Sequence, residues 1–389
     1  MRRLALALTL GAALTTAFLS APASSGTPAA RHGSERTCPA APHGFAACLA
    51  RVVTDSSGKP FATNGPSGYN PADIRSAYQL TTSGSGTVAI IDAYDDPTAE
   101  SDLGTYRAKF GLPPCTTANG CFKKVNQTGG STPPKVNAGW ATEISLDLDM
   151  VSATCPGCHI LLVEATSNSF ANLGAAVNYA AGVPGVVAVS NSYGGSDSAQ
   201  TSAYNHPGIA ITASTGDAGY GVESPASYNT VIAVGGTSLR TAANSRGWTE
   251  SAWSGAGSGC STINATTVQN TTTTSCPKKA NADVSAVADP QTGVSVYDTT
   301  RYQGRSGWQV YGGTSASAPI IASVFALAGN TGVGSATQYP ASLLWSHATS
   351  LFDAVGGSNG SCSPSKWCTG VSGWDGPTGL GTPNGTTAF

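Results

Sequence analysis

Residues 87–92 read Thr-Val-Ala-Ile-Ile-Asp, and this run decides the fold. Short apolar runs rich in β-branched residues are typical of strands buried on both faces of a sheet. A helix is expected directly after it, from about residue 98 to residue 110. A strand that leads into a helix in this way is the repeating unit of a parallel sheet.

The alternation continues along the chain. Further helices are expected over about residues 141–153 and 169–181, and one begins at the N-cap pair Asn70-Pro71. Further buried strands are expected at residues 159–163, 186–189, 208–213 and 231–234. We therefore predict an α/β protein with a single main domain, in which a parallel sheet has helices on both faces. Reactive groups of such a sheet gather at the carboxyl ends of its strands.

The N-terminus carries a targeting signal. Arg2-Arg3 precedes an apolar run over residues 4–19 and a small-residue cleavage motif, Ala21-Pro22-Ala23. We predict a signal peptide over 1–23, a short leader or strap over 24–61 with a helical patch around 45–53, and the main domain over 62–389. The apolar run is too short to span a membrane comfortably. The expected product is secreted and extracellular, with no membrane attachment after signal removal.

Charge excludes one class of partner. The formal net charge is −2 and only 10% of residues are charged, so no basic face for nucleic acid is expected. A monomer is expected.

The ten cysteines of an exported chain indicate disulfide bonds. Sequence alone does not fix their connectivity, and pairing of nearest neighbours is the simplest hypothesis. The expected pairs are Cys38–Cys48, Cys115–Cys121, Cys155–Cys158, Cys260–Cys276 and Cys362–Cys368.

A candidate nucleophile lies in the stretch Gly312 to Pro319, before an apolar helix expected over 319–328. Ser315 at the mouth of this helix would gain from its unpaired N–H groups and its positive end. An ordinary helix start with a serine cap explains the same residues. None of the five histidines has the glycine-rich surroundings of a subtilisin-type base.

Two carboxylates offer an alternative base. Glu143 and Asp147 are four residues apart in a helical segment, beside a predicted buried stripe. A proton shared between them would separate their pKa values and suit a general base and its orienting partner. A solvated acidic helix face is the alternative.

A third carboxylate, Asp217, follows the predicted strand at 208–213. In its protonated form it could donate a hydrogen bond to an oxyanion. A turn-capping aspartate is an equally good explanation of the local sequence.

These motifs together resemble the sedolisin family, the serine-carboxyl peptidases. The resemblance rests on Glu143-x-x-Leu146-Asp147, Ser214-x-Gly216-Asp217 and the segment Gly313 to Pro319, in that order. It extends from about residue 62 to the end. It implies a subtilisin-like fold with a single catalytic domain, and a secreted endopeptidase that hydrolyses proteins or peptides at acidic pH.

The resemblance also assigns roles. Ser315 would be the nucleophile, Glu143 the general base and later acid, Asp147 its orienting partner, and Asp217 the oxyanion donor. One structural Ca²⁺ site is implied near the C-terminus, with ligands from Asp353, Ala354, Val371, Gly373 and Asp375. Relatives usually carry a long folded pro-region, whereas about forty residues separate the signal from Asn70 here.

Three alternatives remain open. A subtilisin-type protease would use Asp92 as the orienting acid and His159 as the base. A non-catalytic secreted binding module on a peptidase scaffold is the second. Esterase or transfer chemistry at Ser315 is the third.

Overall fold

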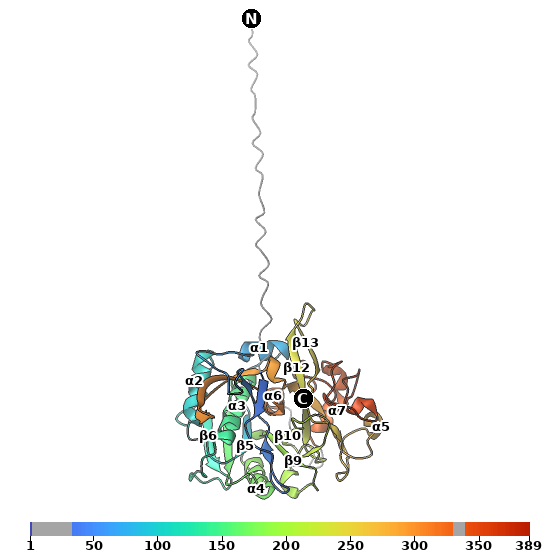
Figure 1. Ribbon diagram of the computed structural model, residues 1–389, viewed down its shortest axis with the longest axis horizontal. Coiled ribbons are helices and arrows are strands. Elements are labelled where there is room, and N and C mark those ends of the chain that lie inside the picture. Colours follow the sequence, from blue (N-terminus) through green and yellow to red (C-terminus); the bar gives the residue numbers. More distant parts are fainter. Residues whose placement is uncertain (2–32, 330–338) are drawn as a thin grey trace. The chain divides into compact units, whose positions relative to one another are not determined.

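The computed structural model describes Met1, residues 33–329 and residues 339–389. The predicted signal peptide and the first part of the predicted leader lie outside these residues. The predicted α/β architecture is confirmed: an eight-stranded, mainly parallel sheet has helices on both faces (Figure 1). Among the described helices, none has the length and apolar character needed to cross a membrane.

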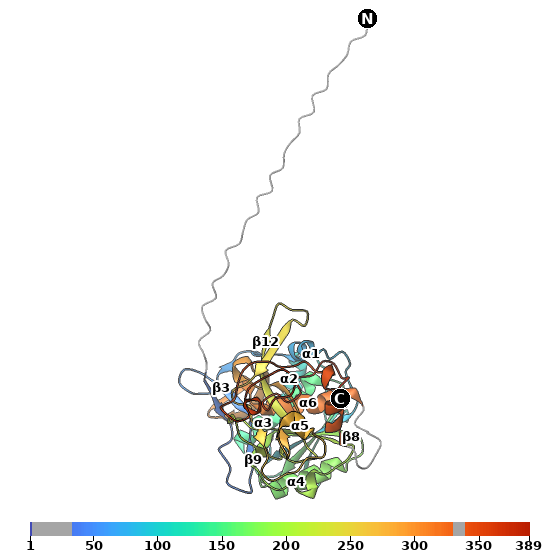
Figure 2. The same cartoon turned by 90° about the vertical axis from the view of Figure 1, so that its right-hand side faces the viewer.

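The central sheet has the order β13-β12-β10-β8-β5-β7-β6, with β16 paired to β12. All its pairs are parallel except β12 with β13, whose hairpin projects beyond the sheet (Figures 1 and 2). Its strands are β5 Thr87–Ala93, β6 Phe122–Asn126, β7 His159–Ala165, β8 Val186–Asn191, β10 Ala210–Ser214, β12 Ile232–Thr241, β13 Trp248–Ala252 and β16 Val284–Val287.

Alternate residues of β5 pack on opposite faces of the sheet, as the pleat of a strand requires. Val88 and Ile90 belong to one apolar core, which includes residues of α3 and α6. Ala89 and Ile91 belong to a second core, which includes residues of α4. Figure 1 accordingly shows α4 on the opposite side of the sheet from α3 and α6.

The helices begin and end close to their predicted limits, with one exception. They are α1 Pro71–Ala77, α2 Ala99–Lys109, α3 Ala138–Thr154, α4 Phe170–Ala181, α5 Thr271–Thr274, α6 Thr314–Ala328 and α7 Ala341–Ser346. The exception is α6, which begins five residues before Pro319 and therefore includes Ser315 in its first turn. Short 3-10 helices are η1 Ser202–Tyr204, η2 Pro290–Thr292, η3 Ala348–Ser350 and η4 Ser365–Trp367.

The predicted helical patch around residues 45–53 is wrong, because this segment is extended. It contributes β2 Ala47–Cys48 and β3 Arg51–Thr54 to two smaller sheets. Its apolar residues are buried by pairing with other strands rather than by one face of a helix.

The first smaller sheet has the order β1-β3-β18-β17, with β4 on β18; the second has the order β11-β9-β2; the third pairs β14 with β15. Their other strands are β1 Gly33–Arg36, β4 Ala62–Thr63, β9 Tyr193–Ser196, β11 Glu223–Ser224, β14 Gly259–Cys260, β15 Ala280–Asn281, β17 Val294–Tyr302 and β18 Arg305–Gly312. All five nearest-neighbour disulfides are present.

The start of α1 gives a test of helix capping. The Asn70 side chain accepts hydrogen bonds from the N–H groups of Ala72 and Asp73, and the Asp73 carboxylate accepts one from the Asn70 N–H. We expect Asn70→Ala to lower the free energy of unfolding by about 1 kcal/mol, measured by urea denaturation. Asn70→Ser keeps an acceptor and should stay close to wild type; equal losses in both variants would contradict the capping role.

Candidate active site

The carboxyl ends of three neighbouring strands carry the candidate site. Ile91 of β5 pairs with Asn191 of β8, which in turn pairs with Ala213 of β10. The residues that follow therefore emerge at one level of the sheet, as the parallel fold requires. They lead to Asp92, to Ser192 and to the turn that holds Asp217.

Glu143 and Asp147 lie one turn apart on α3, and the exposed fraction of each is 0%. The alternative of a solvated acidic face is therefore wrong for these residues. Every residue from Gly139 to Thr154 is buried, because α1, α2, α6 and β17 pack around α3. The two carboxyl groups thus share an environment with little access to water.

This environment controls their protonation. Burial raises the pKa of Glu143 well above its ordinary value, and the charge of Asp147 raises it further, while the Ser315 hydroxyl and the Ala50 N–H act in the opposite direction. Burial also raises the pKa of Asp147, opposed by a hydrogen bond from Ser192. The pair therefore retains a proton at pH values where exposed carboxylates have lost theirs.

Asp92 extends this group to three carboxyls. It lies near the end of β5 with 0% exposure, and neither of its oxygens has a hydrogen-bond partner in the described part of the chain. Burial raises the pKa of Asp92, and Asp147 and then Glu143 raise it further. The sequence indicates a role for Asp92 only as the partner of a histidine.

That histidine lies elsewhere. His159 is exposed at the start of β7 and pairs with Thr87, whereas Asp92 pairs with Glu164 at the other end of the same two strands. Five residues of strand separate the two levels by about 16 Å. A direct hydrogen bond between Asp92 and His159 is therefore excluded, and the subtilisin-type alternative is wrong.

Ser315 is buried in the first turn of α6, and its hydroxyl donates to the Ser192 carbonyl at 3.2 Å. Pro319 lies four residues later and has no N–H to donate to the Ser315 carbonyl. The Ser192 hydroxyl oxygen lies 3.3 Å from that carbonyl oxygen instead. Because of the proline, the Ser315 carbonyl lacks its usual partner within the helix, and a residue that follows β8 lies beside it.

Ser192 joins the serine to the acids, since its hydroxyl also lies 2.7 Å from Asp147 Oδ1. Its position immediately after β8 was the only signal in the sequence that could have identified it.

Asp217 is held beside the start of α6. Its Oδ1 accepts from the Thr314 N–H at 2.8 Å and from the Thr314 hydroxyl at 2.9 Å. Its buried Oδ2 has no hydrogen-bond partner among the described residues. Burial raises the pKa of Asp217 to about 6, opposed first by the hydrogen bonds from Thr314. A protonated Oδ2 is a free donor, as an oxyanion requires.

Gly313 explains how close these groups come. Its φ is 96°, a conformation that favours glycine, and a Cβ atom there would collide with the Leu49 carbonyl oxygen and would lie 2.6 Å from Asp217 Oδ2. The chain around Leu49 therefore lies against the mouth of α6.

The structure thus places the four predicted catalytic residues in one cluster, through Ser192 and Thr314. It also places the five predicted calcium ligands on two adjacent C-terminal segments. Asp353 Oδ2 accepts from the Gly373 N–H at 2.9 Å, and Asp375 Oδ2 accepts from the Val371 N–H at 3.0 Å.

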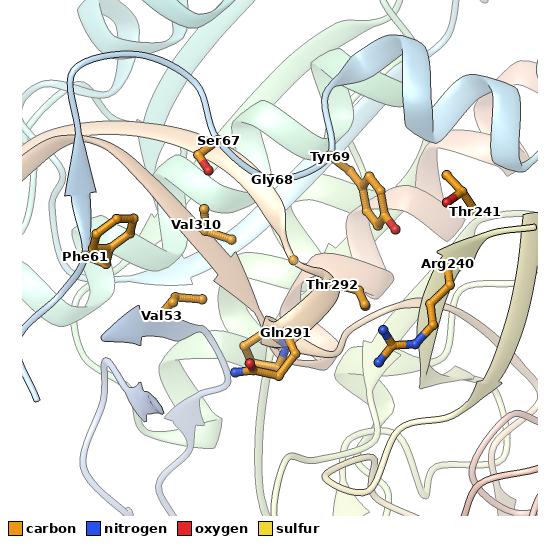
Figure 3. A pocket seen from close by; sticks show the side chains of 12 residues that line it. Val53, Phe61, Ser67, Gly68, Tyr69, Arg240, Thr241, Gln291, Thr292 and Val310 are labelled. Carbon is orange, nitrogen blue, oxygen red and sulfur yellow. The ribbon is translucent and has the colours of Figure 1, made fainter. Parts of the chain in front are cut away.

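A cavity of about 660 Å³ lies outside this cluster. Figure 3 shows apolar Val53, Phe61 and Val310 on one side of it, and Tyr69 and Arg240 on the other. None of the four candidate catalytic residues lines it. Residues of the segment 46–50 lie against the candidate catalytic cluster, since the Ala50 N–H donates to Glu143 Oε2 at 2.7 Å and the Leu49 N–H donates to the Ser192 carbonyl at 3.2 Å.

Comparison with known proteins identifies the family. The sequence profile of the subtilase peptidase family matches residues 123–350, more than half of the chain. The chain belongs to the subtilase family.

Similar proteins agree with the predicted sedolisin resemblance. Kumamolisin from Bacillus sp. (strain MN-32) is 29% identical over 368 residues, which cover 82% of this chain and 63% of kumamolisin. The chain therefore spans less than two thirds of the length of that relative. The prediction of a sedolisin-type, subtilisin-like protein is confirmed.

Solved structures support the fold. A Pseudomonas sedolisin, described as a serine-carboxyl proteinase in complex with pseudo-iodotyrostatin, has a TM-score of 0.67 at 22% identity and covers 82% of this chain and 96% of its own. Sphericase has a TM-score of 0.51 at 17% identity, covering 83% of this chain and 98% of its own.

The buried acids predict how stability depends on pH. Between pH 3.8, the ordinary pKa of Asp217, and about 6, the folded chain holds a proton that the unfolded chain has lost. Stability from this group is therefore complete at low pH and falls as the pH rises through this window, by ~3 kcal/mol. We expect urea denaturation of a Ser315→Ala chain, which cannot digest itself, to show this fall between pH 4 and 7.

Asp217→Asn in the same background is the matched control, and it should remove this part of the pH dependence. Two other acids act in the same direction, since burial raises the pKa of Glu223 to about 7 and that of Asp298 to about 8. Stability that increases from pH 4 to 7 would contradict the assignment.

Proposed function

We propose that the chain is a secreted serine-carboxyl endopeptidase that hydrolyses peptide bonds at acidic pH. The observation that carries the proposal is the bridge formed by Ser192, which joins Ser315 of α6 to Asp147 of α3 beside the buried Glu143. Glu143, whose carboxyl group also interacts with the Ser315 hydroxyl, would then serve as the proton acceptor in place of a histidine. Family membership supports peptide or protein substrates.

The mechanism follows from the positions of these groups. The Ser315 oxygen attacks the substrate carbonyl carbon, and Glu143 takes the serine proton. Protonated Asp217 donates from Oδ2 to the oxyanion of the tetrahedral intermediate. Glu143 then gives its proton to the leaving nitrogen, and water hydrolyses the acyl-enzyme by the same steps in reverse order.

The Asp217 pKa of about 6 sets the upper limit of activity, since the ionised form cannot donate. We expect hydrolysis of an unfolded protein to fall as the pH rises above about 6. Asp217→Asn keeps a donor but loses the titration, so its residual activity should lack this limb. Asp217→Ala should lower kcat at pH 4 at least about a hundredfold, because one oxyanion donor is lost.

Ser315→Ala is the control for contaminating peptidases and should be inactive throughout. Glu143→Gln tests the base and should lose activity at every pH. Cleavage that is undiminished at pH 8 would overturn the carboxyl mechanism. Absence of cleavage at any pH, from a folded chain, would favour the non-catalytic binding module.

The C-terminal segments have the chemistry of a calcium site. Calcium prefers six to eight oxygen ligands, including carboxylates and main-chain carbonyls. Within the described residues, the carbonyl oxygens of Ala354, Val371 and Gly373 accept no hydrogen bond, so they are free to coordinate a cation. Asp353 also raises the pKa of Asp375, after the larger effect of burial, as two neighbouring carboxylates should.

No described cluster holds three or more His, Cys, Asp or Glu side chains suited to a metal. A site here would depend on main-chain oxygens. We propose that Asp353 and Asp375 would hold Ca²⁺ together with those three carbonyls, and that the ion would link residues 353–354 to residues 371–375. Its contribution would be structural, with no part in the chemistry at Ser315.

This predicts a calcium-dependent melting temperature. Calcium at about 100 times its Kd should stabilise the Ser315→Ala chain by ~2.7 kcal/mol, and a chelator should remove the effect. Magnesium is the matched control and should have little effect, because it demands a tighter octahedral shell. The shift should be lost in Asp353→Asn; a melting temperature that ignores calcium would refute the site.

Export and a monomeric state remain predictions. The five disulfides support an oxidising compartment, which is the expected location of a secreted peptidase.

A further inference from the structure

The cavity of about 660 Å³ has no role in the chemistry proposed for Ser315, yet it has the features of a ligand site (Figure 3). Its volume falls within the range of about 300–1,000 Å³ that is typical of sites for small ligands. Its walls come from segments that are far apart in the sequence: β3, residues 61 and 67–69, the end of β12, η2 and β18. The complete fold therefore forms the cavity, rather than one loop.

The wall around Gly68 is fixed by main-chain pairing. The φ of Gly68 is 85°, and a Cβ atom there would lie 2.7 Å from the Gly293 carbonyl oxygen. This close approach lets the Tyr69 N–H donate to the same oxygen at 2.8 Å, while the Ser295 N–H donates to the Tyr69 carbonyl at 2.9 Å. The segment that carries Tyr69 is thus held against the start of β17, so the cavity is formed before any ligand binds.

The side chain of Tyr69 is also fixed. Its hydroxyl donates to the Leu239 carbonyl at 2.8 Å, and its ring packs edge-on against Trp248 with the ring centroids 5.3 Å apart. Figure 3 shows Thr241 and Arg240 on the same side of the cavity as Tyr69. This side is polar.

Arg240 gives the polar side a positive charge. It is the one charged residue among the twelve that line the cavity, and none of the twelve is acidic. Within the described residues its guanidinium forms no ion pair and no hydrogen bond. Asp289 directly precedes η2, but its oxygens accept from the Ser238 hydroxyl at 2.6 Å and from the Gln291 N–H at 2.9 Å. The charge of Arg240 is therefore left for an anion.

The opposite side of the cavity is apolar, since Val53, Phe61 and Val310 lie there (Figure 3). The exposed fractions of Val53 and Val310 are 5% and 8%, and both residues line the cavity. A ligand that covers them would remove their last apolar surface from water. The two sides together select a ligand with an apolar body and one anionic end.

The α-carboxylate of a peptide is an anion of this kind. A guanidinium binds a carboxylate through two parallel hydrogen bonds, which fix its direction as well as its charge. The α-carboxyl group has a pKa of about 3.3–3.7, below the value of about 4.3 for a glutamate side chain. It therefore stays ionised in much of the acidic range in which the proposed peptidase would work.

We propose that this cavity binds the C-terminal end of a peptide whose last residue is apolar. The α-carboxylate bonds to Arg240, and the last side chain lies against Val53, Phe61 and Val310. The binding chemistry stands without the proposed peptidase function. Only the origin of the ligand rests on that function, because each peptide bond that is hydrolysed releases a new α-carboxylate. The occupant would then be a product of the reaction, held outside the catalytic cluster.

The test uses the full chain with Ser315→Ala, which cannot digest the probe, at pH 5.5. The probe is the tripeptide Ala-Ala-Leu with a fluorescent label at its N-terminus, prepared as the free acid and as the C-terminal amide. Fluorescence anisotropy gives the Kd of each form. We expect the free acid to bind at least about tenfold more tightly, because the amide loses the ionic hydrogen bonds to Arg240.

The apolar side has its own arm of the test. The labelled free acid of Ala-Ala-Ser keeps the α-carboxylate but loses the apolar last side chain. It should bind at least about tenfold more weakly than Ala-Ala-Leu. Equal affinities of the two acids would contradict the role of Val53, Phe61 and Val310.

Arg240→Gln in the same background assigns the binding to this cavity. It should lower the affinity for the free acid at least about tenfold and leave the affinity for the amide unchanged. Arg301→Gln is the matched control, since Arg301 is an exposed arginine of β17 that does not line the cavity. It should bind both forms like the parent chain, and melting temperatures establish that both variants are folded.

Equal affinity for the acid and the amide would overturn the proposal. So would an Arg240→Gln chain that binds the acid as tightly as the Arg301→Gln chain does. Octanoate, an apolar carboxylate without a peptide group, is the competitor: if it binds more tightly than the tripeptide acid, the assignment to peptides is wrong. None of these outcomes depends on catalysis, so a failure here leaves the proposed peptidase function standing, and that function is tested separately by cleavage at Ser315.

Discussion

Burial of two acids on one helix is the constraint on which the rest of this structure depends. Glu143 and Asp147 lie one turn apart on α3, which has almost no contact with water. Two negative charges at that spacing would repel strongly in such an environment. The low-energy state therefore keeps a proton in the cluster, and Ser192 supplies a hydroxyl donor to the charge that remains. The retained proton follows from packing as much as from the residues themselves.

Periodicity predicted most of the fold. The strand at 87–92, the helices at 98–110 and 169–181 and the parallel order follow from apolar patterns that local physics controls. Nearest-neighbour pairing of the ten cysteines was also correct, since short loops are the easiest to close. The start of α6 was predicted too late, because proline usually occupies the first turn of a helix. Here Pro319 lies inside the helix, which begins five residues earlier.

The candidate site was only partly visible in the sequence. Glu143, Asp147, Asp217 and Ser315 were found from motifs that resemble a known family. Burial of Asp92 beside them depends on packing between α3 and the sheet, which no local pattern reveals. The segment around Leu49 gave the wrong signal: its apolar residues suggested a helix, but they are buried by two strand pairings with residues more than 140 positions away. Contacts of that range are set by the complete fold.

Pro319 changes the hydrogen bonding of the first turn of α6, which contains Ser315. In an unbroken helix, the carbonyl of Ser315 would bond to the fourth residue after it, and fraying of the first turn would move the serine with the helix. Here the nearest polar group is the hydroxyl oxygen of Ser192, which directly follows β8 and lies 3.3 Å from that carbonyl oxygen. The first turn of α6 is therefore in contact with the end of β8 on both sides of this serine, since the Ser315 hydroxyl also donates to the Ser192 carbonyl. The missing N–H of Pro319 thus leaves room for a residue of the sheet beside the first turn of α6.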